Sequence, residues 1–468
     1  MQDLAEKVMD RARSRGVRFA DIRLLDGTGT SILVQDGRAD RVSQSRVLGG
    51  GVRVLLDGAW GLATTESLSL ADLEACLDDA IDLARAGAGH VLDPGAVAEA
   101  PPVRDEVRPD LERDPAHVPA DEKMRLLTGL ERAGVAAGNG RVVNSIVSYG
   151  DSRRRLVCAN TAGSLVDDET ARVGVVAVMV AERDGLLQRA QEVRRWAGGF
   201  ERVAALTPDD VSALAARKAV ALLDAKPAPA GRFPVVFHPT ITGLLAHEAL
   251  GHNAEADGVW AGESILDGRM GEMIAAPTVT IVDDSTISGA YGSYAYDSEC
   301  TPSRRRTIVE QGRLVGFLHS LETAARMGAE PNGSARAEDH AVPPVVRMSN
   351  TFIAPGDTPA DEIFDGIDRG VYLQDGHWGY VFVERGQYVC NAGRGRMIEN
   401  GQLGEPLRDV CVGGRTLETL KEIEAVADDF ALGSPGTCGK RGQGAPVDCG
   451  GPHVRVRSLV VGGQRADG

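Results

Sequence analysis

The sequence is poor in aromatic residues and contains no long apolar run. Phe, Trp and Tyr together account for 4% of its 468 residues, whereas hydrophobic residues as a whole account for 43%. A globular core must therefore be built mainly from Val, Leu, Ile and Ala. Because no apolar run reaches the roughly 20 residues that cross a bilayer, the sequence predicts no membrane-spanning helix.

Positive charge is also in deficit. The chain has 51 Lys and Arg residues against 67 Asp and Glu residues, which gives a formal net charge of −16. Phosphate backbones and anionic lipid surfaces repel a chain of this charge. We therefore expect neither a nucleic acid nor a membrane as its partner.

Neither a secretory signal nor a disulfide framework is indicated. The first residues, MQDLAEKVMDRARSRG, carry charges throughout and lack an apolar centre, unlike a signal peptide. The seven cysteines are odd in number and scattered along the chain, which favours reduced thiols. Together these features predict a cytoplasmic protein.

Helical and β-like segments alternate in the first half of the chain. Helices are predicted at residues 3–15, 69–87, 120–137 and 208–225. The Asp-Gly pairs at 36–37 and 57–58 separate short β-like runs, as the turns of β-hairpins do.

The segment DAKPAPAGR, residues 224–232, is the best candidate for a domain boundary. After it, strands and glycine-rich turns dominate, and helices are expected only at 240–250, 319–327 and 417–426. We therefore predict an α+β fold. Residues 1–226 would form an α/β domain with an antiparallel sheet and helices, and residues 233–468 a C-terminal, mainly β domain.

The stretch LLAHEALGHNAEADG, residues 244–258, has three residues between Glu248 and His252. Thr240 is the expected N-cap of the helix that leads into it. On a straight α-helix, His247 and His252 would lie about 140° apart, too far for both to bind one ion. Either Gly251 in the left-handed conformation or a single π-type turn would bring the two side chains together.

This pattern favours a catalytic zinc site. Two neutral imidazoles bind Zn²⁺ readily, and a catalytic site needs three protein ligands and an open position for water. Glu248, next to one histidine in sequence, is a candidate general base for that water. The competing interpretation is two histidines on the surface at the end of a helix.

The spacing of this motif does not identify the third metal ligand. Glu255 and Asp257 follow closely and could bind the ion, or they could accept a hydrogen bond from a ligand histidine. A distant residue is the other choice. Cys438 is one, because it lies in the glycine-rich loop GSPGTCGKRGQGAPVDCGGP, residues 433–452, where Gly436 and Gly439 would let its backbone approach another segment.

The motif HEALGHNAEAD resembles the TldD branch of the TldD/PmbA (TldD/TldE) family of metalloproteases. The resemblance extends over the chain, through VQDGRADRVSQSRVLGGGVRVLLDGAWGLATT, GSYAYDSECTPSRRRTIVEQGRLVGFLHS, PPVVRMSNTFIAPGD and GTCGKRGQGAPVDCGGP. It implies an α+β N-terminal domain followed by a largely β C-terminal domain. It also implies a zinc ion held by His247, His252 and Cys438, with Glu248 as general base.

The same resemblance implies an activity and an assembly. The expected activity is hydrolysis of amide bonds in unfolded peptides by metal-activated water. The expected assembly is a dimer, either of identical chains or with a TldE/PmbA-like paralogue that lacks the metal. The alternatives are an amide hydrolase acting on a small natural-product intermediate and a catalytically silent partner subunit, although the intact motif argues against the second.

Two segments depart from the family pattern. Residues 298–300 read SEC where an acid and a glycine are expected, and GHWGYVFVERGQYVC, residues 376–390, also differs. Since the metal motif is intact, we expect both segments to line the substrate side of the site.

Overall fold

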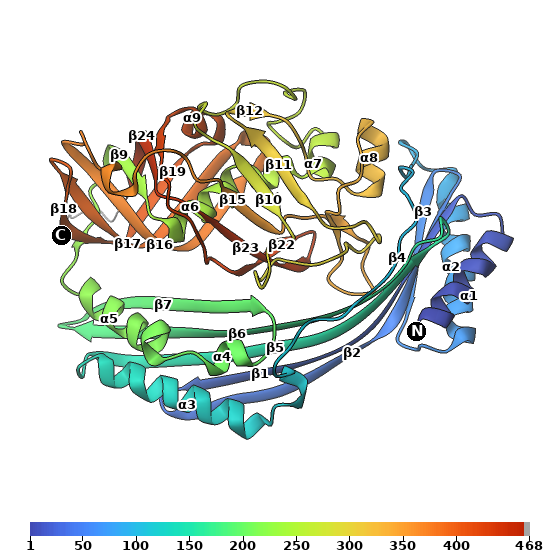
Figure 1. Ribbon diagram of the computed structural model, residues 1–468, viewed down its shortest axis with the longest axis horizontal. Helices are drawn as coiled ribbons and strands as arrows, with labels where there is room; N and C mark the ends of the chain where they lie inside the picture. Colours follow the sequence, from blue (N-terminus) through green and yellow to red (C-terminus); the bar gives the residue numbers. More distant parts are fainter. Residues whose placement is uncertain (463–468) are drawn as a thin grey trace.

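The computed structural model describes residues 1–462, which form two lobes (Figure 1). The first lobe is a long curved sheet with helices on one face, and the second is a β-rich body lying over the other face. This architecture confirms the predicted α+β class. Within the described residues, no helix combines the length and apolarity needed to cross a bilayer.

The first lobe contains one seven-stranded sheet. Its strands are β1 (Phe19–Gln35), β2 (Arg38–Leu56), β3 (Ala59–Thr65), β4 (Arg104–Val107), β5 (Val142–Asn160), β6 (Leu165–Arg183) and β7 (Leu186–Ala197). The order is β3-β2-β1-β5-β6, and both β4 and β7 pair with β6. All neighbours are antiparallel except β4, which runs parallel to β6.

Five helices accompany this sheet, namely α1 (Gln2–Ser14), α2 (Leu70–Ala88), α3 (Ala120–Ala137), α4 (Glu201–Ala204) and α5 (Ser212–Leu222). The four helical segments predicted in this half are therefore confirmed, although a separate 3₁₀ turn at Pro208–Asp210 precedes α5. Both Asp-Gly pairs form tight hairpin turns. Asp36, Gly37, Asp57 and Gly58 all have positive φ, between 48° and 82°, as type I′ turns require.

The long strands of the sheet have two chemically different faces. On β6, Val173, Val175 and Ala177 pack with residues of α3 and α5 in one apolar core. Because side chains alternate along a strand, Arg172 and Gly174 belong to the opposite face. That face is turned toward the second lobe (Figure 1).

The second lobe contains short helices and several sheets. Its strands are β8 (Lys226–Pro227), β9 (Gly231–Phe237), β10 (Ile281–Asp284), β11 (Arg305–Glu310), β12 (Arg313–Leu314), β13 (Ala335–Arg336), β14 (Val345–Val346), β15 (Asn350–Ile353), β16 (Arg369–Phe382), β17 (Gln387–Glu399), β18 (Gln402–Arg408), β19 (Val410–Arg415), β20 (Ile423–Val426), β21 (Ala431–Leu432), β22 (Gly436–Lys440), β23 (Gln443–Gly451) and β24 (Val454–Gly462). Its helices are α6 (Pro239–Leu245), α7 (Ala256–Trp260), α8 (Leu321–Met327) and α9 (Thr416–Lys421).

Two sheets organise this lobe. One has the order β12-β11-β10-β15-β23-β21, with β22 attached to β23. The other has the order β16-β9-β24-β19-β17-β18-β8, and an additional β16–β17 pairing closes five of its strands into a ring. A core of Val, Leu, Ile and Ala side chains, with few aromatic rings, fills the lobe, as the composition predicts.

Two secondary-structure predictions in this lobe are wrong. The helix expected at 417–426 ends at Lys421, because residues 423–426 form β20 and pair with β24. The glycine-rich loop expected at 433–452 is largely the hairpin β22–β23. We propose residues 1–226 and 233–468 as the two domains, since the chain leaves α5 and joins the second lobe through β8 and β9.

A buried ion-pair cluster joins the two lobes. The Nε of Arg53, on β2, donates to Asp21 of β1 at 2.9 Å, and its Nη2 donates to Glu299 of the second lobe at 2.7 Å. All three side chains are at most 6% exposed. The expectation that residues 298–300 line the substrate side is therefore wrong, because Glu299 is used to dock the lobes.

The same junction is tight enough to require glycine. Arg23 is fully buried and donates to the backbone carbonyls of Asp339 and Val342. A β-carbon at Gly51 would lie 2.0 Å from the carbonyl oxygen of His340. The loop of the second lobe can therefore reach β2 only where β2 has no side chain.

We expect Glu299→Ala to lower the free energy of unfolding by about 3–5 kcal/mol, because it removes one partner from a buried charge cluster. The comparison variant is Glu405→Ala, which breaks the exposed pair between Lys226 and Glu405 and should change stability by less than about 1 kcal/mol. Urea titrations of both variants measure this difference. Equal effects of the two substitutions would contradict a structural role for Glu299.

Candidate metal centre

The helix that leads into the histidine motif has its N-cap two residues earlier than predicted. His238 is the N-cap of α6, and its Nδ1 accepts a hydrogen bond from the backbone N–H of Thr240 at 3.1 Å. The prediction of Thr240 as the cap is therefore wrong. Pro239 at the first helical position explains the shift, because its fixed φ suits that position and it has no N–H to leave unpaired.

A π-helical turn joins the two histidines. The segment η3 (Ala246–Gly251) is π-helical, and the 3₁₀ turn η4 (His252–Ala254) follows it. Gly251 has φ −52° and ψ −51°, so of the two predicted alternatives the left-handed glycine is wrong and the π-type turn is confirmed. Glycine serves another purpose here, because a β-carbon would lie 2.0 Å from the sulfur of Met348.

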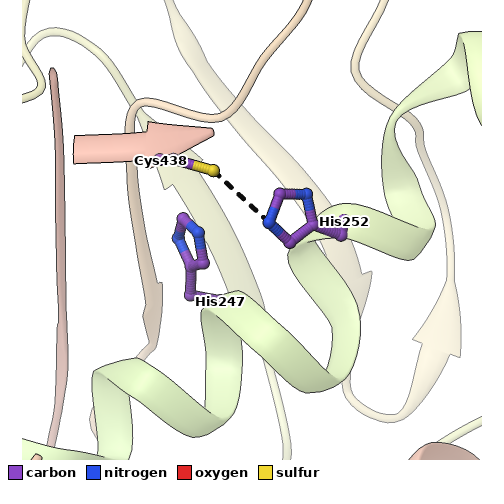
Figure 2. Close-up of side chains that lie close together, drawn as sticks. All are labelled: His247, His252 and Cys438. Atoms are coloured by element: carbon purple, nitrogen blue, oxygen red, sulfur yellow. Dashed lines mark hydrogen bonds between the residues drawn. The ribbon is translucent and has the colours of Figure 1, made fainter. Parts of the chain in front are cut away.

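The turn and the hairpin bring three donor groups together. His247 and His252 lie on the helical segment and Cys438 on β22, and one donor atom from each lies within 4.8 Å of the others (Figure 2). Cys438 Sγ is 3.3 Å from His252 Nε2. The two imidazole rings are 5.0 Å apart at an angle of 86°. The structure thus assembles the three residues that the family resemblance implied.

The hairpin, rather than flexible glycine, positions Cys438. Gly436 and Gly439 have open space at the β-carbon position, so the close approach expected for them is not seen. The buried guanidinium of Arg347 donates to the backbone carbonyls of Cys438 and Gln443, one in each strand of the hairpin. Arg347 had no role in the sequence-based prediction, because no local pattern marks an arginine that binds backbone 91 residues away.

Glu255 supports His252 from the side away from the sulfur. His252 Nδ1 donates to Glu255 Oε2 at 3.1 Å, which leaves Nε2 facing Cys438. Lys440 donates to Glu255 at 3.0 Å and to Asp257 at 2.6 Å. Both carboxylates therefore lie outside the three-donor cluster, in the supporting position that was one of their two predicted alternatives.

Lys440 is a functional residue that the sequence prediction missed. It lies two residues after Cys438 on β22, so the two side chains share a face of the strand. Burial would raise the pKa of the Glu255 carboxyl, but the charges of Lys440 and His252 lower it to about 2. The two-residue spacing of Cys438 and Lys440 is present in the sequence, but it indicates a shared face only if residues 436–440 are interpreted as a strand.

The sulfur of Cys438 is held as a thiolate. Burial would raise the pKa of the thiol, but the imidazolium charges of His247 and His252, together with their hydrogen bonds, lower it to about 4. The other thiol of the same hairpin behaves differently, because burial raises the pKa of Cys449 well above its usual range. The structure therefore separates one ligand-like cysteine from a structural one.

The donor set fits a zinc ion. Two imidazoles and one thiolate are a ligand combination that Zn²⁺ accepts, with a fourth position free for water. Nδ1 of His247 is buried and finds no hydrogen-bond partner among residues 1–462. A buried polar atom without a partner is costly, so this arrangement favours a site shaped for a ligand.

The cluster opens onto a cavity of about 1020 Å³ between the lobes. Glu248 lies in its wall beside Gly379 of β16, where a β-carbon would come within 2.5 Å of the Glu248 Cγ. Residues 376–381 also line the cavity, as expected for that departure from the family pattern. Residues 191–195 of β7, which the sequence did not mark, form part of the opposite wall.

Comparisons with known proteins identify a family that covers most of the chain. Three family models match: PmbA/TldA metallopeptidase domain 1 over residues 20–84, the central domain over 113–223 and the C-terminal domain over 230–463. A protein named metalloprotease from Methanothermobacter thermautotrophicus is 41% identical over 452 residues, covering 96% of each chain.

Two further proteins are informative. A zinc metalloprotease TldD homolog from Saccharolobus solfataricus is 35% identical over 237 residues, which are 50% of this chain and 52% of that one. Among solved structures, TldE from Thermococcus kodakarensis is similar with a TM-score of 0.79 at 17% identity, covering 98% of this chain and 100% of its own. At that identity the likeness concerns the fold alone.

We expect Cys438 in chelator-treated protein to react with iodoacetamide at a rate that is flat between about pH 6 and 8. Above its pKa of about 4 the sulfur is already a thiolate, whereas the rate for an ordinary thiol rises about tenfold per pH unit below its pKa. Cys449 is the internal control, because it lines the same cavity but stays protonated. Peptide mass spectrometry measures both. Equal labelling of Cys438 and Cys449 at pH 6 would contradict the assignment of Cys438 as a thiolate.

Proposed function

Because this chain belongs to the PmbA/TldD metallopeptidase family, we propose that it is a zinc-dependent peptidase that hydrolyses amide bonds of unfolded peptides. The observation that carries the proposal is the cluster of His247, His252 and Cys438 at the wall of a cavity of about 1020 Å³. The metallopeptidase role follows from the family, whereas the ligand set, the metal identity and the substrate are our proposals.

In this proposal His247, His252 and Cys438 hold the ion, and Glu255 orients His252. A bound zinc ion would supply Lewis acidity toward the substrate carbonyl and toward water. Glu248 accepts the proton from the attacking water, and its protonated carboxyl group can then return that proton to the leaving amine. Gly379 leaves the space that the Glu248 side chain occupies.

A small natural-product amide is the second candidate substrate. The cavity is large enough for either class, because a volume of about 1020 Å³ is at the upper end of small-molecule sites. Since the cavity lies between two lobes and residues 191–195 of β7 line it, we favour a peptide. A catalytically silent subunit is disfavoured, because all three donors and Glu248 are present.

We further propose a dimer with a second copy or with a TldE-like paralogue, because TldE from T. kodakarensis has the same fold and the family resemblance implies a dimer. Light scattering should give twice the chain mass for the purified protein or for its mixture with such a paralogue. A fully active monomer would overturn this.

We also propose a cytoplasmic location, since all seven cysteines are unpaired. Cell fractionation tests this proposal.

The central test is Glu248→Gln. The amide keeps the size of the side chain but cannot accept a proton, so turnover should fall by about 10²–10⁴-fold. Bound zinc should stay near the wild-type level, because Glu248 is not a proposed ligand. Turnover of an unfolded peptide and zinc by elemental analysis are measured on the same preparation.

The matched variant is Cys438→Ala, which should lose both zinc and turnover. Full zinc occupancy in Cys438→Ala would overturn the cysteine assignment and direct attention to Glu255 or Asp257. Near-normal turnover of Glu248→Gln with normal zinc would mean that another residue is the base.

A further inference from the structure

A second, smaller cavity lies beside the candidate catalytic cavity. It has a volume of about 400 Å³ and is bounded by the first-lobe sheet on one side and by Tyr291 and Thr437 of the second lobe on the other. Val176, Arg195 and Thr437 line both cavities. Because Thr437 directly precedes Cys438, the smaller cavity begins next to the metal cluster.

The hollow results from small side chains in register across the sheet. Ser43, Ser31, Gly150, Gly174 and Arg195 pair in sequence from β2 through β1, β5 and β6 to β7, so their side chains share one face. A β-carbon at Gly174 would lie 2.5 Å from Arg195 Cγ. The side chain of Arg195 therefore lies across Gly174, in the cavity wall.

Arg195 is the arginine of this cavity that is free to bind a ligand. Among residues 1–462 it has no ion pair or hydrogen bond, and its guanidinium carbon is 5.6 Å from the centre of the Tyr291 ring. Arg172 is already committed, because it donates to the backbone carbonyls of Tyr291 and Ser293. The neighbouring Arg194 is paired with Glu192 at 3.1 Å.

Among the described residues that line the smaller cavity, no free acid opposes the charge of Arg195. Asp151 is the one acidic residue in the cavity lining, and its carboxylate accepts from Lys123 of α3 at 2.6 Å. It therefore points to the helix-covered face of the sheet. The cavity presents one uncommitted guanidinium together with hydroxyl groups of Ser31, Ser43 and Thr437, which is a suitable environment for a carboxylate.

We propose that this cavity is a subsite for a carboxylate group of the peptide substrate, bound by Arg195. The proposal rests on the proposed function, since it takes the ligand to be part of a peptide held in the adjoining cavity. The carboxylate has two possible sources, the C-terminus of the peptide and an acidic side chain. Both offer two oxygens to the forked donors of a guanidinium.

The test measures equilibrium binding, so that it does not depend on turnover. One fluorescently labelled unfolded peptide is made with a free C-terminal carboxylate, as the C-terminal amide, and as the amide with Glu as its last residue. Fluorescence anisotropy gives Kd for each in the Glu248→Gln background. We expect the free acid to bind about tenfold or more tightly than the plain amide, as a charge-assisted contact permits.

The discriminating variants are Arg195→Gln and Arg194→Gln. The first should bring the acid-to-amide ratio of Kd values close to one, whereas the second should leave it unchanged, because Arg194 is paired with Glu192. Tight binding of the Glu-amide peptide as well would identify any carboxylate as the ligand, and weak binding of it would identify the C-terminus. A ratio near one with Arg195 present, a ratio that survives Arg195→Gln, or no binding of any peptide would overturn the subsite.

Hydrolysis by the wild-type protein separates this proposal from the proposed function. If the wild-type protein cleaves the free-acid and the amide peptide equally well, the proposed function is supported and the subsite is overturned. If the free-acid peptide binds more tightly than the amide but the wild-type protein cleaves neither, the subsite is supported and the proposed function is overturned.

Discussion

The alternation of side chains along β1, β2, β5 and β6 is the constraint on which both lobes depend. One face carries the apolar residues, which pack with α3 and α5 on β1, β5 and β6 and with α1 and α2 on β2. The other face carries the polar residues and the glycines of these strands, here Arg, Asp, Ser and Gly. Arg23 and Arg53 use that face to dock the second lobe. On the same face, Ser31, Gly150 and Gly174 leave space beside the three donor groups of the candidate site. The cavity is thus a consequence of strand geometry.

The sequence alone predicted those elements of the fold whose residue patterns are local. The Asp-Gly turns and the first four helices could be predicted because their patterns lie within one element. The five-residue separation of His247 and His252 predicted that the helix must be distorted between them, but it could not choose between two distortions. The structure has the π-type turn, and Gly251 lies in it against Met348, a contact between segments 97 positions apart in the printed sequence.

Several errors originate in contacts between segments that are distant in sequence. Residues 423–426 form a strand because β24 offers a partner edge. Residues 436–440 are different, because they pair with the next strand, β23, in a local hairpin that the prediction of a loop missed. Glu299 is a docking residue because Arg53 lies 246 residues earlier in the chain. Arg347 and Arg195 could not be identified either, since each contacts a segment that no short window contains. Lys440 was missed for another reason, because residues 436–440 were interpreted as a loop.

The distance in sequence between His252 and Cys438, 186 residues, affects how the centre comes into existence during translation. Both imidazoles leave the ribosome long before the thiolate, and the intervening segment contains most of the second lobe. A growing chain that stops short of β22 has two of the three donors, and the wall of its cavity is incomplete. Under the proposed function, amide-cleaving chemistry would therefore be withheld until the lobe that encloses the three donors has been synthesised.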